Sequence, residues 1–238
     1  MIDYINGTFS LILVSISFIV GIILIFKYFK TKEKIFVLVG LSWIFIVEPW
    51  FPSTFAFLCF LLTNKLPPDR IYLLLGTILL PFTLLIWIYA FTEFMSIKKQ
   101  KLILILLAII GVVYEIYLIY YWISDPYIIG FITGPVDVNY NIVVNIYLIS
   151  LLILVEVTGI IFARATIRSP ELETKLKGKL LLIAWLLFLC GSILDIISAN
   201  SILILSIARI ILIISALAFY SSFNLPNRMK KLFGIQEL

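Results

Sequence analysis

Long runs of apolar residues, separated by short charged turns, make up most of the 238-residue chain. A helix needs about 20 predominantly apolar residues to cross the hydrocarbon of a bilayer. Seven runs reach that length, which predicts an all-α integral membrane protein, with residues 1–238 forming a single seven-helix membrane domain. The predicted spans are Phe9–Phe29, Ile35–Leu62, Ile71–Met95, Leu102–Ile123, Asn141–Ala163, Leu180–Ala199 and Ile202–Phe223.

Basic residues fall almost entirely on one side of these spans. Alternate loops hold fifteen Lys and Arg residues on one side and two, Lys65 and Arg70, on the other, while Arg209 lies inside the last span. Cytoplasmic loops of membrane proteins are enriched in Lys and Arg. We therefore expect the N-terminus outside the cell membrane and the C-terminus in the cytoplasm. The same asymmetry accounts for the net charge of +5, so it indicates no nucleic-acid partner.

The composition excludes several kinds of chemistry. Only 13% of the residues are charged and 63% are apolar, whereas a soluble domain carries about 25% charged residues. The chain has no histidine and two cysteines, Cys59 and Cys190, each inside an apolar run. Histidine-held metal or haem, histidine acid–base catalysis and a disulfide framework are thereby excluded. We expect no catalytic residues, no metal, no cofactor and no enzymatic activity.

Six ionisable residues lie in or near the spans, where a charge at the bilayer centre costs about 2.5–3.5 kcal/mol and needs a reason. Glu93 is close enough to the inner end of its span to reach the headgroups, and Glu156 lies in the inner half of the fifth span. The other four fall in the outer half. They form the candidate ligand-binding set Glu48, Glu115, Asp195 and Arg209.

Two interpretations of this set remain open. Asp195 and Arg209 lie on either side of a short turn, so they can form an ion pair that only holds the sixth and seventh spans together. Alternatively, Glu48 and Glu115 join them in a water-accessible pocket for a cationic or polar ligand, or for a proton. Pro49 and Pro52 follow Glu48 directly, and we expect the second and third spans to be kinked by their prolines.

The outer loop Ser124–Tyr140 is the longest on that side, and it contains Asp125-Pro126 and Gly134-Pro135. Either it covers the mouth of the pocket as a lid, or it merely connects two spans. The aromatic residues just before it form a belt at the membrane surface or line the pocket mouth; they are Tyr114, Tyr117, Tyr120, Tyr121 and Trp122. Asn6-Gly7-Thr8 matches the N-glycosylation pattern on the predicted outer side.

The third inner loop predicts a helix that starts after Ser169-Pro170, because serine suits an N-cap and proline the first helical position. Glu171–Lys175 and Glu173–Lys177 are spaced for i,i+4 ion pairs along that helix. We expect the basic inner surface to contact a cytoplasmic signalling protein. The candidate partner-binding residues are Lys175, Lys177, Lys179, Arg228, Lys230 and Lys231.

Three stretches resemble the seven-helix sensor region of archaeal and bacterial membrane histidine kinases. Residues Arg70–Phe94 are similar to its third span, with Gly76, Pro81 and an aromatic-rich exit at Trp87, Tyr89 and Phe91. Ser124–Phe131 is similar to its outer Asp-Pro stretch, and Arg164–Leu194 to its basic linker and sixth span. The resemblance implies a sensor, here stand-alone without a kinase domain, because only Asn224–Leu238 follows the last span. The family's outer histidine and sixth-span glutamine are missing, so no ligand-binding residue is carried over.

Retinal is excluded because the last span has no lysine to form the Schiff base. Three functions remain: a receptor-like membrane sensor, a proton-coupled transporter with Glu156 as its inner station, and a non-catalytic subunit of a larger membrane complex. Besides the lipid bilayer and the signalling protein, a second copy of the chain is a possible partner.

Overall fold

The computed structural model describes residues 2–198 and 201–226. Within them, seven helical segments are long and apolar enough to cross a membrane, as predicted. Their bounds are Tyr4–Thr31, Ile35–Thr63, Asp69–Phe94, Gln100–Ser124, Ile142–Ile167, Leu172–Ile197 and Ile202–Phe223. The first and sixth segments begin earlier than predicted. In the sixth segment the added residues 172–179 include Glu and Lys, which continue a helix readily beyond the apolar run.

The second and third segments are each interrupted near the middle. The first segment is the single helix α1 (Ile2–Thr31). The second consists of α2 (Ile35–Ile46), the 3₁₀ turn η1 (Glu48–Trp50) and α3 (Phe51–Thr63). The third consists of α4 (Asp69–Leu75) and α5 (Leu80–Phe94). Proline lacks an N–H and clashes with the preceding helical turn. Pro49 lies in η1, Pro52 opens α3 and Pro81 opens α5, so the expected kinks in both spans are confirmed.

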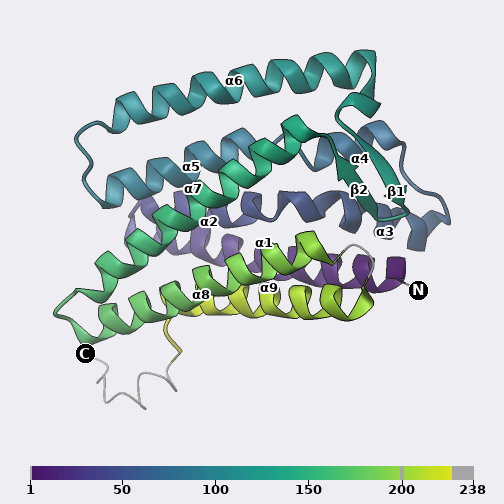
Figure 1. The fold of residues 1–238 in the computed structure, drawn as a ribbon. Coiled ribbons are helices and arrows are strands. Elements are labelled where there is room, and N and C mark those ends of the chain that lie inside the picture. The colour runs from purple at the N-terminus through teal and green to yellow at the C-terminus, as the bar shows by residue number, and fades with distance from the viewer. Residues whose placement is uncertain (1, 199–200, 227–238) are drawn as a thin grey trace. The chain divides into compact units, whose positions relative to one another are not determined.

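Contacts divide the chain into two compact units, residues 1–153 and 154–238, so the predicted single domain stays a prediction. In the first unit α1 packs against α2 and α3, α2 against α5, and α5 against α6 (Gln100–Ser124) (Figure 1). Gly21 and Gly40 allow α1 and α2 to approach closely, because a Cβ on either glycine would lie within 2.7 Å of the other's carbonyl oxygen.

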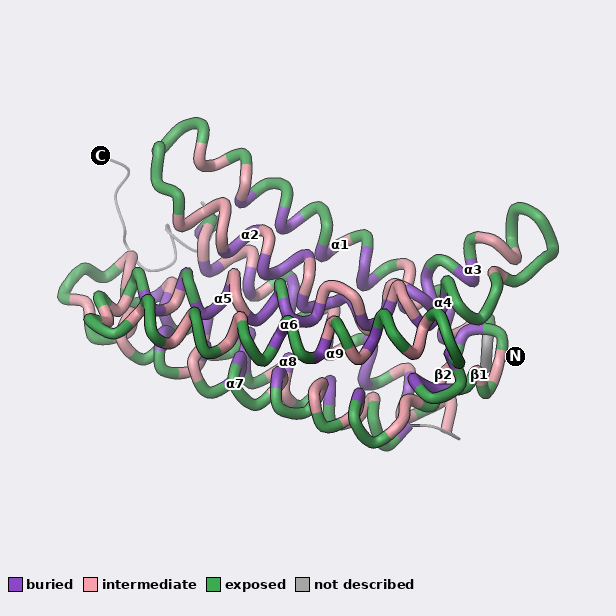
Figure 2. Tube along the Cα trace, turned by 90° about the horizontal axis from the view of Figure 1, so that it is seen from above, coloured by how far each residue is buried: buried purple, intermediate pink, exposed green. Residues whose placement is uncertain are grey.

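Figure 2 shows that exposed residues recur along the length of α6. Nearly all of them are apolar, including Ile109, Val113 and Ile116, which are more than half exposed. Such a face suits the hydrocarbon of a bilayer, where no hydrogen bonds are available to polar groups. Association with a second copy or a larger complex stays a prediction.

The outer loop folds into a short β-hairpin, which the sequence analysis did not predict. After the 3₁₀ turn η2 (Pro126–Ile128), β1 (Gly130–Gly134) pairs antiparallel with β2 (Asp137–Tyr140). The signal was present, because a Gly-Pro turn separates two short stretches rich in β-branched and aromatic residues. The hairpin lies beside α4 in the first unit (Figure 1).

The last part of α7 (Ile142–Ile167) belongs to the second unit, where α8 (Leu172–Ile197) packs along α9 (Ile202–Phe223). The Ser215 hydroxyl donates to the Ala184 carbonyl at 2.9 Å, and the Trp185 ring meets Phe219 edge-on. These contacts fix α8 and α9 against each other.

The prediction for the third inner loop was partly wrong. Helix α8 begins at Leu172, with Glu171 in an extended conformation at its N-cap. Because Glu171 lies outside the helix, its carboxylate does not pair with Lys175 as expected but accepts a hydrogen bond from the Thr174 hydroxyl at 2.5 Å. The second expected pair, Glu173 with Lys177, is present at 2.7 Å.

Candidate ligand-binding site

Glu48 lies exactly where the second span is interrupted, and its side chain is fully buried. One carboxylate oxygen, Oε1, accepts a hydrogen bond from the backbone N–H of Leu79 at 2.5 Å. Leu79 is the N-cap residue of α5, and the N–H groups at a helix start have no intrahelical acceptor. A carboxylate there is also favoured by the helix dipole. Glu48 therefore connects the interruptions of two neighbouring spans.

Glu115 and Tyr114 of α6 lie close enough to Glu48 to interact with it electrostatically. Tyr114 is only 5% exposed, and its ring stacks on Tyr147 of α7 with 3.9 Å between centroids and an interplanar angle of 19°. The structure thus brings Glu48 and Glu115 together, as the pocket hypothesis requires. We call Glu48, Glu115, Tyr114 and Tyr147, with Tyr140 described below, the Glu–Tyr cluster.

Tyr140, at the end of β2, brings the hairpin into this cluster. Its hydroxyl lies against Gly76, where a Cβ would be only 2.1 Å away, so a larger residue would displace the ring. Burial raises the pKa of Tyr140 well above its ordinary value, and the hydroxyl therefore keeps its proton. The sequence analysis missed Tyr140 because its place depends on the unpredicted hairpin.

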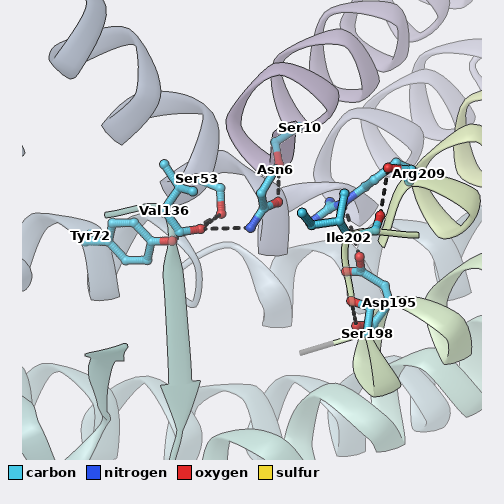
Figure 3. Close-up of polar contacts among 10 residues, drawn as sticks. Asn6, Ser10, Ser53, Tyr72, Val136, Asp195, Ser198, Ile202 and Arg209 are labelled. Atoms are coloured by element: carbon cyan, nitrogen blue, oxygen red, sulfur yellow. Dashed lines mark hydrogen bonds and ion pairs between the residues drawn. The ribbon is translucent and has the colours of Figure 1, made fainter. Parts of the chain in front are cut away.

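A second set of hydrogen bonds fixes the turn of the hairpin (Figure 3). The Val136 carbonyl accepts from the Ser53 hydroxyl at 2.8 Å and from the Asn6 side chain at 3.3 Å, while the Ser53 and Tyr72 hydroxyls lie 3.1 Å apart. The Val136 side chain is buried against Ala56 and Tyr72. The loop is therefore attached to α1, α3 and α4, and its role as a cover over a pocket stays a prediction.

The same contacts correct the interpretation of Asn6 as a glycosylation site. The Asn6 side chain is 6% exposed, lies within α1 and donates to Val136. A glycan needs an accessible asparagine on a surface loop. The sequence pattern is therefore matched by a residue that the fold uses for packing.

Asp195 of α8 and Arg209 of α9 form the ion pair that the sequence predicted (Figure 3). The Arg209 Nε lies 3.1 Å from the Asp195 Oδ1, and the two side chains are 4% and 19% exposed. Both belong to the second unit, whereas Glu48 and Glu115 belong to the first. A pocket that unites all four residues stays a prediction.

The remaining charged residues in the spans occupy different surroundings. Glu156 of α7 is 2% exposed, and within the described ranges neither of its carboxylate oxygens accepts a hydrogen bond. Glu93 is exposed and accepts a hydrogen bond from Gln100 near the inner end of α5. Across residues 2–198 and 201–226, no three His, Cys, Asp or Glu residues gather in a way that would hold a metal.

The aromatic residues of α6 were expected to form a belt at the membrane surface or to line the mouth of a pocket, and they differ in their surroundings. Tyr120 is exposed, as a residue of an interfacial belt is. Tyr114 is buried in the cluster, Tyr117 accepts a hydrogen bond from the Asn141 side chain at 2.7 Å, and Trp122 donates to the Arg70 carbonyl at 2.8 Å. Three of the aromatic residues therefore make contacts in the half of the spans that adjoins the hairpin.

The predicted partner surface is described only in part. Lys175 and Lys179 are exposed on α8, and Lys177 pairs with Glu173. The residues Arg228, Lys230 and Lys231 lie outside the described ranges.

No protein-family model matches the chain, and no curated protein sequence matches it.

Proposed function

We propose that this chain is a receptor-like sensor of the cell membrane, with its N-terminus outside and its C-terminus in the cytoplasm. The observation that carries the proposal is the hydrogen bond between the Glu48 carboxylate and the Leu79 N–H. That bond is made at the interruptions of two spans, where the backbone has the fewest internal hydrogen bonds. A ligand that contacts Glu48 therefore acts directly on the two most deformable points of the first unit.

The route from the site to the cytoplasm runs along α5. This helix begins at the bond to Glu48 and ends at Phe94, next to the basic turn that leads into α6. Displacing the start of α5 moves its far end, because a helix transmits displacement along its axis as a stiff rod. A cytoplasmic partner then reads the change at the basic turn that follows α5, where Lys98 and Lys99 are exposed. The resemblance to kinase sensor regions is in line with this role.

A distance measurement between spin labels tests the proposal. The two native cysteines are first replaced, as Cys59→Ser and Cys190→Ser. Spin labels are then attached to cysteines introduced at Lys30 and Lys98, which are both exposed at one end of the first unit. The distance between the labels reports movement of α1 relative to the α5–α6 turn. Glu48→Gln neutralises the carboxylate as a bound cation would, and we expect a shifted distance distribution. The matched control is Glu33→Gln, an exposed glutamate in the first inner turn. Identical distributions for wild type and Glu48→Gln would contradict the proposal.

A proton-coupled transporter is the second candidate, and Glu156 favours it. Interrupted membrane helices and buried carboxylates are frequent features of transporters. Glu156 is buried, and its oxygens accept no hydrogen bond from the described residues. This alternative predicts pH-dependent solute flux into liposomes that Glu156→Gln abolishes. Absence of flux across a broad solute panel would count against it.

A further inference from the structure

Four oxygen atoms of the Glu–Tyr cluster have no hydrogen-bond partner among the described residues. They are Glu48 Oε2, Glu115 Oε1 and the hydroxyls of Tyr114 and Tyr140. Glu48 is 0% exposed and Tyr114 is 5% exposed, so both are buried. Buried polar groups are nearly always hydrogen-bonded, and an orphaned one needs an explanation. Four orphaned oxygens in one cluster indicate a missing donor.

The missing group also has to be positive. Glu48 and Glu115 carry a formal charge of −2, and they repel each other. The N-terminus of α5 offsets only about half a charge. The sequence supplies no Lys or Arg in residues 35–64, 71–97 or 102–153, which include α2, α3, α5 and most of α4 and α6. Within the spans of this unit, Lys and Arg occur only near the ends, at Lys27, Lys30, Arg70 and Lys101. We therefore look for the compensating charge in a bound group.

The type of acceptor suits an ammonium group. An –NH₃⁺ group has three N–H donors, the free ammonium ion has four, and neither has an acceptor, while the four orphaned atoms are all oxygens that can accept. The stacked rings of Tyr114 and Tyr147 add aromatic surface beside the carboxylates, and a tyrosine ring attracts a cation. A calcium ion takes six to eight oxygen ligands, which is more than the four oxygens of this cluster that lack a partner.

We propose that the Glu–Tyr cluster binds an ammonium group, either of the free ammonium ion or of a small primary amine. Glu48 Oε2, Glu115 Oε1 and the Tyr114 hydroxyl accept hydrogen bonds from it, and the Tyr140 hydroxyl is the fourth unpartnered oxygen of the cluster. Tyr140 and the hairpin cover the site from the outer end of the unit. This inference rests on the proposed sensor function, since it names the class of ligand for the same site.

Thermal unfolding of the purified full-length chain in nanodiscs tests the inference. The additives are ammonium, ethylammonium, tetramethylammonium and sodium chlorides, compared at one pH and one ionic strength. A bound ligand raises Tm with its concentration. We expect ammonium or ethylammonium to raise Tm, whereas tetramethylammonium, which has no N–H, does not. A rise with ethylammonium at lower concentration identifies an organic amine as the ligand, and a rise with ammonium alone identifies the free ion.

Single-residue variants show whether the rise in Tm arises from binding at the Glu–Tyr cluster. We expect Glu115→Gln to weaken the apparent affinity at least tenfold and Tyr114→Phe to weaken it less, while Glu33→Gln keeps the wild-type response. Neither Glu115 Oε1 nor the Tyr114 hydroxyl bonds to a described residue, so these two variants serve even where Glu48→Gln fails to fold. Equal shifts with all four salts, a shift with sodium alone, or a response to acid pH without a response to ammonium would each overturn the inference.

The spin-label distances separate this inference from the sensor proposal. Ammonium binding that leaves the Lys30–Lys98 distance unchanged would overturn the sensor proposal while supporting the ammonium site. A distance that changes with another solute, in a protein that ignores ammonium and ethylammonium, would overturn the ammonium site while supporting a sensor.

Discussion

The Glu48 carboxylate accepts a hydrogen bond from the Leu79 N–H at 2.5 Å, and this bond links the interruptions of two membrane helices that pack together. A helix broken inside hydrocarbon leaves backbone donors that water cannot reach. Glu48 supplies the acceptor for one of them. The same side chain thus has a structural role through Oε1 and remains open to a ligand through Oε2.

The first prediction concerns the two roles of Glu48. Glu48→Ala removes the acceptor and leaves the part-buried Leu79 N–H without its partner, which costs about 1–3 kcal/mol. Glu48→Gln keeps a carbonyl oxygen that can accept from Leu79, so we expect a smaller loss. Thermal unfolding in detergent measures both, with Glu33→Ala as the exposed control. A Gln variant as unstable as the Ala variant would show that the charge, and not the hydrogen bond, stabilises the interruption.

The second prediction concerns the contact between Gly76 and Tyr140. A Cβ at Gly76 would meet the Tyr140 hydroxyl at 2.1 Å and Pro52 at 2.7 Å. We expect Gly76→Ala to destabilise the protein by about 1–3 kcal/mol, as overpacking does, and to loosen the hairpin. Adding Tyr140→Phe removes the clashing oxygen and should restore part of the lost Tm. If the double variant is no more stable than Gly76→Ala alone, the hairpin does not sit on Gly76 as described.

The spans were predictable because hydrophobic length and proline position depend on local sequence. Seven apolar runs and three prolines were enough to indicate seven helices and two interruptions. Helix ends were less predictable, as Leu172 shows, because charged helix formers continue a helix outside the apolar run. Glu171 illustrates the same limit, since an i,i+4 pair forms only when both residues lie within the helix.

The candidate site was predictable only in its charges. Depth along the spans singled out Glu48, Glu115, Asp195 and Arg209 from the sequence. It did not reveal that Glu48 would bond to Leu79, because that contact joins residues from two different spans. Nor did it reveal Tyr140, whose position is set by strand pairing within the loop. Contacts between distant segments are what the linear pattern lacks.

The third prediction concerns the turn of the hairpin. Ser53→Ala removes the 2.8 Å hydrogen bond to the Val136 carbonyl and the hydroxyl contact with Tyr72. We expect a loss of about 1 kcal/mol and faster amide hydrogen exchange in β1 and β2, because the turn loses its main attachment. Thr63→Ala is the matched control, since its hydroxyl donates to carbonyls of its own local turn. Unchanged exchange in Ser53→Ala would mean that Val136 packing alone fixes the hairpin.

The last prediction concerns Asp195 and Arg209. Removing one partner of a buried ion pair leaves the other charge uncompensated, which costs about 3–5 kcal/mol, whereas replacing both with apolar residues is often neutral. We therefore expect Asp195→Asn and Arg209→Ala each to lower Tm, and the double variant Asp195→Leu/Arg209→Met to recover most of it.

The same variants separate a structural pair from a binding site. A recovered double variant that still responds to ammonium indicates that the pair only joins α8 and α9. Loss of the ammonium response in a variant that has regained its stability would instead support the pocket in which all four charged residues take part. Wild-type binding and signalling in both single variants would show that the four-residue pocket is wrong, because the ligand would then need neither charge.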